Sequence, residues 1–265
     1  MAIFQPTWRT LLLDVLMRLP WNVSDGSQSL YERTQFTWKS IGIKARGRSK
    51  KLNQNYRNTQ EILSAAWSMI DSKSTASFSD SKKQKDETFP IIEPSLALRN
   101  GKKPVFVLTK NALTTVEVLF GQIEKLLSRG HQPENIAVIY NYCKGGFYKK
   151  YFQLLIDRLG QNQIEHYWIT ESRKTKRNYS SLLPGVKIIT ASSSLGLEFK
   201  IVMIPWIQQF DRYYSSDRNS ILRNKRKLYV AMTRAQEKLY LFGSGNSSFI
   251  EDFRQSSYFC QVKIR

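Results

Sequence analysis

The stretch VKIITASSSLGLEFKIVMIPW, residues 186–206, decides the fold that this chain can adopt. Two short apolar runs, one formed by Val186, Ile188 and Ile189 and the other by residues 201–204, flank a segment of small polar residues that contains one glycine and one glutamate. Continuous apolar runs of this length predict strands that are buried on both faces, as in a parallel sheet covered by helices. Ligands of open α/β sheets bind beyond the carboxyl ends of the strands, so we expect the polar segment to form a site there.

A second segment, KRKLYVAMTRAQEKLYLFG at residues 225–243, follows after a short interval. Its residues Leu228, Ala231 and Met232 recur at helical spacing, and its last part is an apolar strand candidate. Arg234 falls on another side of the helical turn, near the end of the helix. A cation in that position can point into a cleft. The alternative is an arginine that interacts with the dipole at the helix carboxyl end.

Strand and helix patterns alternate along much of the chain, which predicts an α/β fold with a parallel sheet and helices on both faces. Asn58 followed by Glu61 resembles a capping box, which would start a helix that reaches residue 70 and leave residues 56 and 57 outside any regular element. Residues 71–90 are almost free of aliphatic side chains and are predicted to form a mobile loop. The other predicted elements are helices at 7–19, 115–128 and 149–159, strands at 104–108 and 136–140, and an edge strand at 164–168.

The composition points to a polyanionic partner. The 265 residues are 41% apolar, enough for one large or two modest domains, and the formal net charge is +20. Nucleic acid is the leading candidate for the partner, and the cation-rich run at 44–51 is a candidate contact with its backbone. A solvated surface that serves solubility is the alternative for both features. An anionic membrane is disfavoured because the cations are spread over many segments rather than along one amphipathic helix.

The cysteines and histidines give no metal-binding or disulfide pattern. Cys143 and Cys260 stand alone, and the two histidines are His131 and His166. We therefore expect no metal site and a reducing cytoplasmic location, associated with the nucleoid if the partner is DNA. The apolar start of the chain is interrupted by charges and lacks a basic leader, so it predicts neither a membrane span nor a signal peptide.

Four segments together resemble the motifs of UvrD/Rep-type superfamily 1 DNA helicases. TASSSLGLEF (190–199) and, 29 residues later, YVAMTRA (229–235) resemble motifs V and VI. NYR (55–57) resembles motif IV, and DGSQSLY (25–31) resembles motif III. Each tetrapeptide alone is weak, but four in the right order form a strong pattern that covers most of the chain. The resemblance implies a RecA-like sheet of the P-loop NTPase type.

The resemblance also implies an ATP site and the roles of six residues. Gln28 would sense the terminal phosphate, Arg57 would reach the γ-phosphate, and Arg234 would be the second arginine finger. Tyr56 would stack on the adenine, and Glu198, in the loop with Gly196, would hold the ribose. Taken without the motifs, Gln28 could be a surface glutamine, and Glu198 could be a helix cap or a surface group.

DNA contacts are implied for four residues. Tyr31 lies in motif III, and Arg33 stands where the family often has a base-stacking tryptophan. Thr190 and Ser192 lie in motif V, although Ser192 stands where the family usually has histidine. The expected partner is single-stranded DNA or a junction of single and double strands, and the pathway suggested by the family is DNA repair.

The sequence lacks two motifs that the family uses for phosphates and magnesium. It contains neither GxxxxGK[ST] nor the Asp-Glu pair of a Walker B strand. In the family both lie in the first RecA-like domain, upstream of motif III. Residues 1–50 are therefore interpreted as a remnant of that domain with motif III and a linker, and 51–265 as the second RecA-like domain. The chain would then be the carboxyl half of a split or truncated helicase.

Three hypotheses follow from this reading. The first is the second RecA-like domain of an ATP-dependent 3′-to-5′ DNA helicase, which needs a first RecA-like domain, encoded separately, to supply the Mg²⁺ site in trans. Alone, such a chain should not hydrolyse ATP appreciably, because arginine fingers act on phosphates held opposite them. The second is a non-catalytic nucleic-acid-binding module with a salt-sensitive basic surface. The third is a protein-interaction adaptor.

Overall fold

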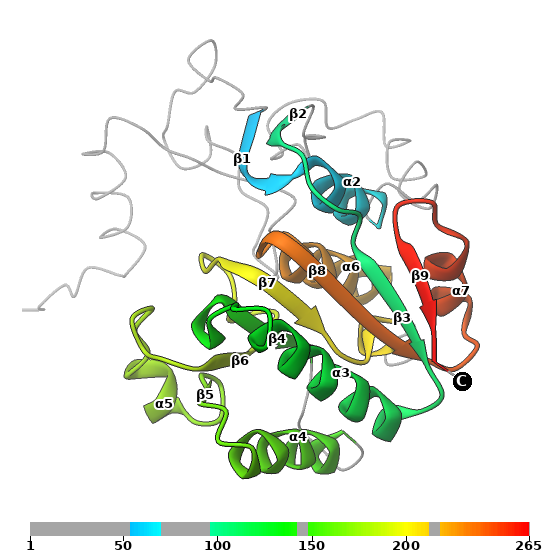
Figure 1. Ribbon diagram of the computed structural model, residues 1–265. Coiled ribbons are helices and arrows are strands. Elements are labelled where there is room, and N and C mark those ends of the chain that lie inside the picture. The colour runs from blue at the N-terminus through cyan, green and yellow to red at the C-terminus, as the bar shows by residue number, and fades with distance from the viewer. Residues whose placement is uncertain (1–53, 70–95, 142–147, 212–217, 265) are drawn as a thin grey trace, which may run out of the picture.

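The computed structural model describes residues 54–69, 96–141, 148–211 and 218–264 (Figure 1). Several predicted features lie outside these described residues. They are the helix at 7–19, the cation-rich run at 44–51, the loop at 71–90, and the motif III region with Gln28, Tyr31 and Arg33. None of the helices within the described ranges is both long enough and apolar enough to cross a membrane.

A seven-stranded sheet forms the centre of the described fold (Figure 1). Its strand order is β5-β6-β4-β7-β8-β3-β9, and every neighbouring pair is parallel. Strand β4 in the middle of the sheet is a continuous apolar run, and all five of its residues are buried. The strands are β3 (Val105–Thr109), β4 (Ile136–Tyr140), β5 (His166–Trp168), β6 (Val186–Thr190), β7 (Phe199–Ile204), β8 (Ala235–Ser244) and β9 (Cys260–Lys263).

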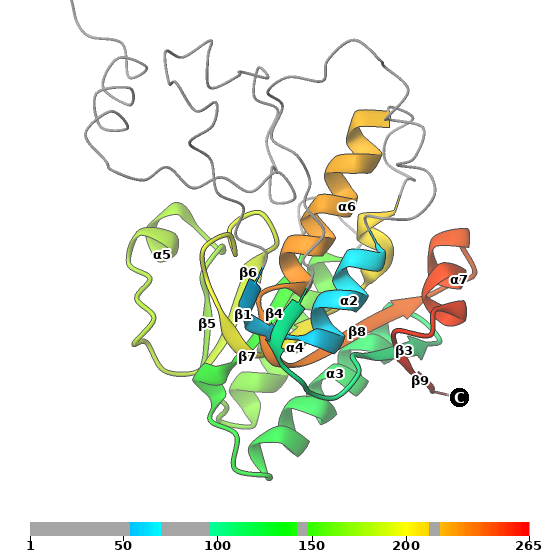
Figure 2. The ribbon, with the colours of Figure 1, turned by 90° about the horizontal axis from the view of Figure 1, so that it is seen from above.

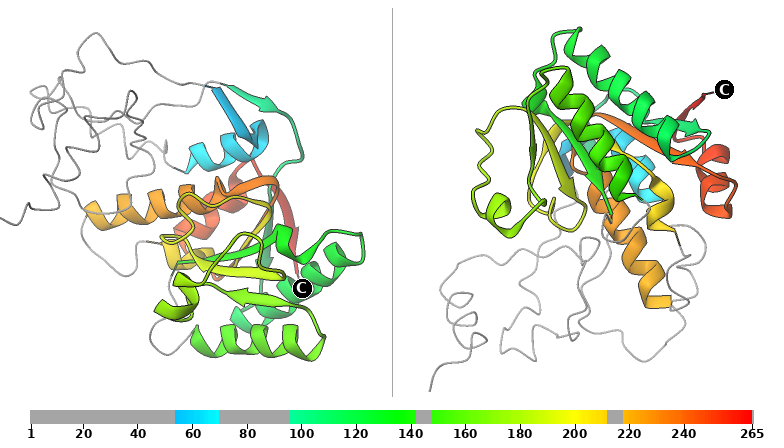
Figure 3. Two further views of the ribbon diagram at one scale, coloured as in Figure 1. Left: turned by 90° about the vertical axis from the view of Figure 1, so that its left-hand side faces the viewer. Right: turned by 90° about the horizontal axis from the view of Figure 1, so that it is seen from below.

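Helices cover both faces of this sheet, as Figures 2 and 3 show. Helices α3 (Ala112–Leu127) and α4 (Lys149–Gln161) pack on one face and share one core cluster with the strands. On the other face lie α2 (Gln60–Ser68), α6 (Arg218–Met232) and α7 (Ser248–Gln255), within a second cluster. The predicted α/β class, with a parallel sheet between two helical layers, is confirmed.

Several short elements have no clear pattern in the sequence. They are strand β2 (Leu96–Arg99), helix α5 (Arg173–Arg177), and the 3₁₀ helices η4 (Pro133–Asn135) and η5 (Ile207–Phe210). Strand β9 at the edge of the sheet was also missed, because all four of its residues are exposed and show no apolar alternation. The edge strand expected at 164–168 is confirmed as β5, the other edge of the sheet.

The segment before α2 differs from its prediction. Residues 54–59 form strand β1 (Gln54–Thr59), which pairs in parallel with β2, so Tyr56 and Arg57 lie inside a regular element. The helix cap is Thr59 rather than Asn58, because the Thr59 side chain accepts a hydrogen bond from the Ile62 amide. The helix ends at Ser68, two residues before the predicted end.

The turn that leads into β6 is held by a buried lysine. Lys187 is 1% exposed, and its ammonium group donates hydrogen bonds to the carbonyl groups of residues 183, 184 and 185. Gly185 within this turn has a φ of 86°, a conformation that favours glycine. A Cβ at this position would lie 2.5 Å from the carbonyl carbon of Glu165, so the strand β5 approaches the turn too closely for a side chain.

Gly185→Ala should therefore lower the free energy of unfolding by about 2–4 kcal/mol, because a positive φ costs about 1–2 kcal/mol and the contact with backbone adds to it. Gly130→Ala is the matched control, since its φ is 82° and no atom lies within 4 Å of its added Cβ. That control should cost only about 1–2 kcal/mol. Urea unfolding of both variants measures the difference, and equal costs would contradict the close approach of β5.

Candidate functional site

Three segments that are distant in sequence meet at the amino ends of β7 and β8. Arg57 on β1 forms an ion pair through its Nε with Oε1 of Glu198, the residue that precedes β7. The other carboxylate oxygen of Glu198 accepts a hydrogen bond of 2.9 Å from the Gln236 side chain at the start of β8. The Arg57 and Glu198 side chains are 40% and 33% exposed, so solvent and ligands can reach the pair.

Asn58 fixes this meeting point. Its side chain is 1% exposed, and its Nδ2 donates hydrogen bonds of 2.8 and 2.6 Å to the carbonyl oxygens of Thr233 and Ala235. These partners are 175 and 177 residues away in sequence. Loss of the amide would leave two buried carbonyl groups unpaired, at a cost of about 1–3 kcal/mol each. Strand β1 is thereby held against the junction of α6 and β8.

Arg234 lies at that junction but does not project into a cleft, so this part of the prediction is wrong. The side chain is 1% exposed. Its Nε donates 3.0 Å to the carbonyl oxygen of Val230 in the last turn of α6, and its Nη1 donates 3.2 Å to that of Leu197. The guanidinium group thus satisfies carbonyl groups at the helix end, as in the alternative interpretation, and braces the loop next to Glu198.

The location of Glu198 contradicts the expectation that the polar segment forms a site beyond the carboxyl ends of the strands. The segment that begins at Thr190 starts at the carboxyl end of β6, but it crosses the sheet and delivers Glu198 to the amino end of β7. The amide of Phe199 then bonds to the carbonyl oxygen of Arg234 at 3.0 Å, which aligns the starts of β7 and β8. Gly196 in this segment is exposed and has a φ of 85°, so it permits the turn before Glu198.

The structure separates Thr190 and Ser192, the two described residues that were predicted to bind DNA, from the Arg57–Glu198 pair. Thr190 ends β6, and its carbonyl oxygen accepts hydrogen bonds of 3.0 Å from the amides of Ser193 and Ser194. Ser192 lies partly exposed in the same turn. Both belong to the carboxyl edge of the sheet, whereas Tyr56, with 66% of its surface exposed, lies on β1 with Arg57.

Two residues of the site were missed by sequence reasoning. Gln236 follows the motif VI segment, and its type alone gives no reason to expect a bond to Glu198. Asn58 was interpreted as a helix cap, and a buried asparagine with distant partners cannot be told from a cap by sequence. Its position directly after the NYR segment was the available signal.

A further contact between ionisable side chains joins His131 to β8. His131, before β4, has its Nε2 2.7 Å from the Lys238 ammonium group. Burial, followed by the positive charge of Lys238, lowers the pKa of His131, so its ring is neutral at pH 7 and accepts from the lysine. Within the described ranges, no group of three or more His, Cys, Asp or Glu side chains could hold a metal ion.

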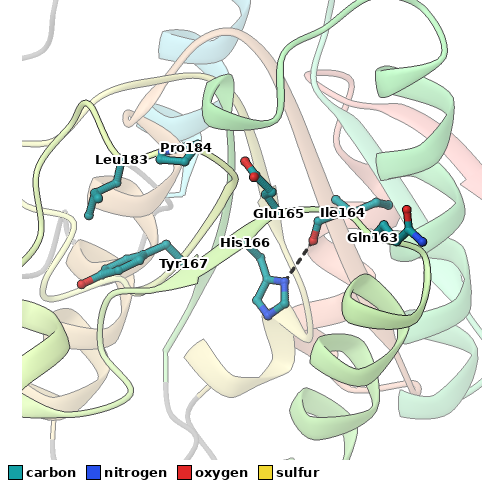
Figure 4. Close-up of a pocket in the computed structure, with 7 residues that line it drawn as sticks. All are labelled: Gln163, Ile164, Glu165, His166, Tyr167, Leu183 and Pro184. Carbon is teal, nitrogen blue, oxygen red and sulfur yellow. Dashed lines mark hydrogen bonds between the residues drawn. The ribbon is translucent and has the colours of Figure 1, made fainter.

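A shallow pocket occurs elsewhere, along the edge strand β5 (Figure 4). Inside it the His166 ring contacts the carbonyl oxygen of Ile164 at 3.1 Å. None of the residues predicted for ATP or DNA lines this pocket. Its lining residues are Gln163, Ile164, Glu165, His166, Tyr167, Leu183 and Pro184.

Comparison with known proteins agrees with the fold and the motifs. Residues 50–178 and 169–244 match the family described as the UvrD-like helicase C-terminal domain. A Bacillus subtilis protein named "Putative ATP-dependent DNA helicase YjcD" is 28% identical over 199 residues, which are 72% of this chain and 24% of that protein. The chain therefore spans about a quarter of the length of this curated relative.

A solved structure shares the fold. It is the C-terminal domain of a possible DNA helicase from Lactobacillus plantarum, with a TM-score of 0.50 and 18% sequence identity. The match covers 78% of this chain and 98% of that domain. Since the matched family covers well over half of the sequence, this chain belongs to the UvrD-like helicase C-terminal domain family.

Proposed function

We propose that this chain supplies the second half of the ATP site of a UvrD/Rep-like, ATP-dependent 3′-to-5′ DNA helicase. The observation that supports this most is the meeting of Arg57, Glu198 and the Arg234 junction at one place, at the amino ends of β7 and β8. Residues 51–265 form the second RecA-like domain in this proposal, and residues 1–50 carry motif III and a linker. The Walker motifs lie in a first RecA-like domain that faces this edge.

The Arg57–Glu198 pair suits a nucleotide site because little free energy is needed to separate its two side chains. An ion pair this exposed contributes only about 0–1 kcal/mol to stability. A nucleotide can therefore separate the two side chains at little cost. Arg57 then turns its planar fork to the γ-phosphate, and Glu198 accepts a hydrogen bond from the ribose hydroxyl. The adenine stacks on the exposed ring of Tyr56 on the same strand, and Gly196 leaves open space in the turn before Glu198.

Arg234 has a larger barrier to its proposed role. As a second arginine finger, its guanidinium group must exchange its bonds to Leu197 and Thr233 for phosphate oxygens. Approach of the first domain, with Gln28 of motif III sensing the terminal phosphate, provides the reason for that exchange. Until then Arg234 holds the loop that carries Glu198.

Magnesium is held by the first domain in this proposal. The described residues contain no acidic cluster for it, and Glu198 is already bonded to Arg57 and Gln236. Mg²⁺ bound there would neutralise charge on the β- and γ-phosphates. Arginine fingers contribute about a thousandfold or more to hydrolysis, but only when phosphates are fixed opposite them. This chain alone should therefore hydrolyse almost no ATP.

DNA is the proposed partner at the opposite edge of the sheet. Thr190 and Ser192 offer hydroxyl groups at the carboxyl end of β6, and Tyr31 and Arg33 would complete the contact from motif III. The formal charge of +20 favours a polyanion, taken here as single-stranded DNA or a junction with duplex. DNA repair is the pathway that we propose for this helicase.

One observation favours a second candidate function. The burial of Arg234, with its hydrogen bonds already satisfied, fits a non-catalytic nucleic-acid-binding module as well as an ATPase half-site. In that case the basic surface would bind DNA, and no nucleotide chemistry would occur with any first domain.

ATP hydrolysis tests the two candidates directly. The chain, mixed with the Walker-containing first domain of a UvrD-like helicase, Mg²⁺ and single-stranded DNA, should hydrolyse ATP, and Arg57→Gln should lower kcat about 10²–10³-fold. Tyr258→Phe, an exposed ring between α7 and β9, is the control and should leave the rate unchanged. Hydrolysis by the chain alone would contradict the half-site. A mixture that hydrolyses no ATP but still binds DNA would favour the non-catalytic nucleic-acid-binding module.

Arg57 and Arg234 should differ sharply in their effect on stability. Arg234→Ala should lower the free energy of unfolding by about 2–4 kcal/mol, because it removes the Arg234 donor to the Leu197 carbonyl oxygen and one of two donors to that of Val230, and leaves a cavity in place of a buried side chain. Arg57→Ala should change it by about 1 kcal/mol or less, since its ion pair is exposed. Urea unfolding compares the two, and equal small effects would show that Arg234 is not held as described.

A further inference from the structure

A compact basic surface lies beyond the carboxyl ends of β5 and β6, away from the Arg57–Glu198 pair. Helix α5 has the sequence RKTKR, and its four cations are all exposed. Within the part of the chain that the structure describes, none of the four forms an ion pair with a carboxylate. We call Arg173, Lys174, Lys176 and Arg177 the α5 basic surface.

This helix is short, yet it is firmly fixed. Ser172 and Thr175 form a capping box, with bonds of 3.1 Å from the Thr175 amide to the Ser172 hydroxyl and 3.0 Å from the Ser172 amide to the Thr175 hydroxyl. The hydroxyl of Tyr167 on β5 donates to the Thr175 carbonyl oxygen at 2.8 Å. The cations are therefore presented from a preorganised backbone, which lowers the entropy lost when a ligand binds.

The α5 basic surface is continuous with the turn after β6. The Lys176 ammonium group donates 3.0 Å to the Ser193 hydroxyl, and the Ser193 amide bonds to the carbonyl oxygen of Thr190. Because β5 and β6 are parallel neighbours, their carboxyl ends lie at the same edge of the sheet. Figure 3 shows α5 beside this edge. The Lys176–Ser193 contact thus joins the α5 basic surface to the turn that contains Ser192.

We propose that the α5 basic surface binds the phosphodiester backbone of single-stranded DNA, and extends the strand's path from Thr190 and Ser192 across the helix. This proposal rests on the proposed function, which supplies DNA as the partner. Guanidinium groups bind phosphate oxygens through two parallel hydrogen bonds, and serine and threonine hydroxyls add neutral contacts to the same backbone. Helix α5 itself has no apolar side chain that could enter a membrane surface.

Two double variants, which change the net charge equally, test whether the α5 basic surface binds DNA. Arg173→Gln/Arg177→Gln removes two exposed cations, four residues apart, from the α5 basic surface. Lys125→Gln/Arg129→Gln removes two exposed cations at the same spacing from the end of α3, at the other edge of the sheet. Each double variant lowers the formal net charge of +20 by two, so net charge alone affects both equally. All four side chains are exposed, so neither variant should disturb folding.

Binding is measured by fluorescence anisotropy of a labelled oligothymidylate over a range of NaCl concentrations. The α5 variant should bind about tenfold more weakly, and the slope of log K against log salt should fall by about 1.4, for two phosphate contacts on a single strand. The α3 variant should bind within about twofold of the unmodified chain, with an unchanged slope.

Two results would overturn the inference while leaving DNA binding intact. They are an equal loss in both variants, or an α5 variant that binds like the unmodified chain. Displacement of the DNA by polyglutamate of equal charge would also overturn it, since an acidic protein would then fit as well as a phosphodiester. Absence of DNA binding by the unmodified chain would overturn the DNA part of the proposed function together with this inference.

Discussion

The arrangement of the candidate site depends on the buried amide of Asn58. Its two hydrogen bonds to the backbone of the α6–β8 junction hold β1 in place, although β1 pairs only with the short strand β2 among the described strands. With β1 held there, Arg57 meets Glu198, and Glu198 in turn meets Gln236. Desolvated amide–carbonyl bonds are costly to leave unmade, so this junction is a stronger constraint than the exposed ion pair it positions.

A single segment connects the two proposed binding regions. Residues 190–199 begin at the carboxyl end of β6, beside the α5 basic surface, and end at the amino end of β7, beside Arg57. Arg234 holds this segment through Leu197, and Lys176 contacts it through Ser193. The segment is therefore the continuous physical link between the edge proposed to bind DNA and the edge proposed to bind nucleotide.

Much of the sheet was predictable from sequence, because β4 is an apolar run, and β6 and β7 are largely apolar apart from Lys187 and Lys200. The segments of motifs IV, V and VI lie close together in the structure, through the Arg57–Glu198 pair and the bond from Arg234 to Leu197, whereas motif III lies outside the described residues. Burial of Arg234 was not predictable, since its carbonyl partners come from the folded helix end and from a loop 37 residues away. The edge that carries Glu198 was mispredicted because it depends on the path of a crossing segment, which local pattern does not encode.

In the proposed helicase domain, nucleotide binds at the edge of the sheet where Arg57 and Glu198 meet. Photolabelling with an azido-adenine analogue of ATP tests it most directly, with Mg²⁺ and a Walker-containing first domain present. The label should attach to the peptide that contains Tyr56, and Asn58→Ala should abolish that attachment by releasing β1. Labelling instead at the pocket along β5, or labelling at Tyr56 that survives Asn58→Ala unchanged, would contradict this account.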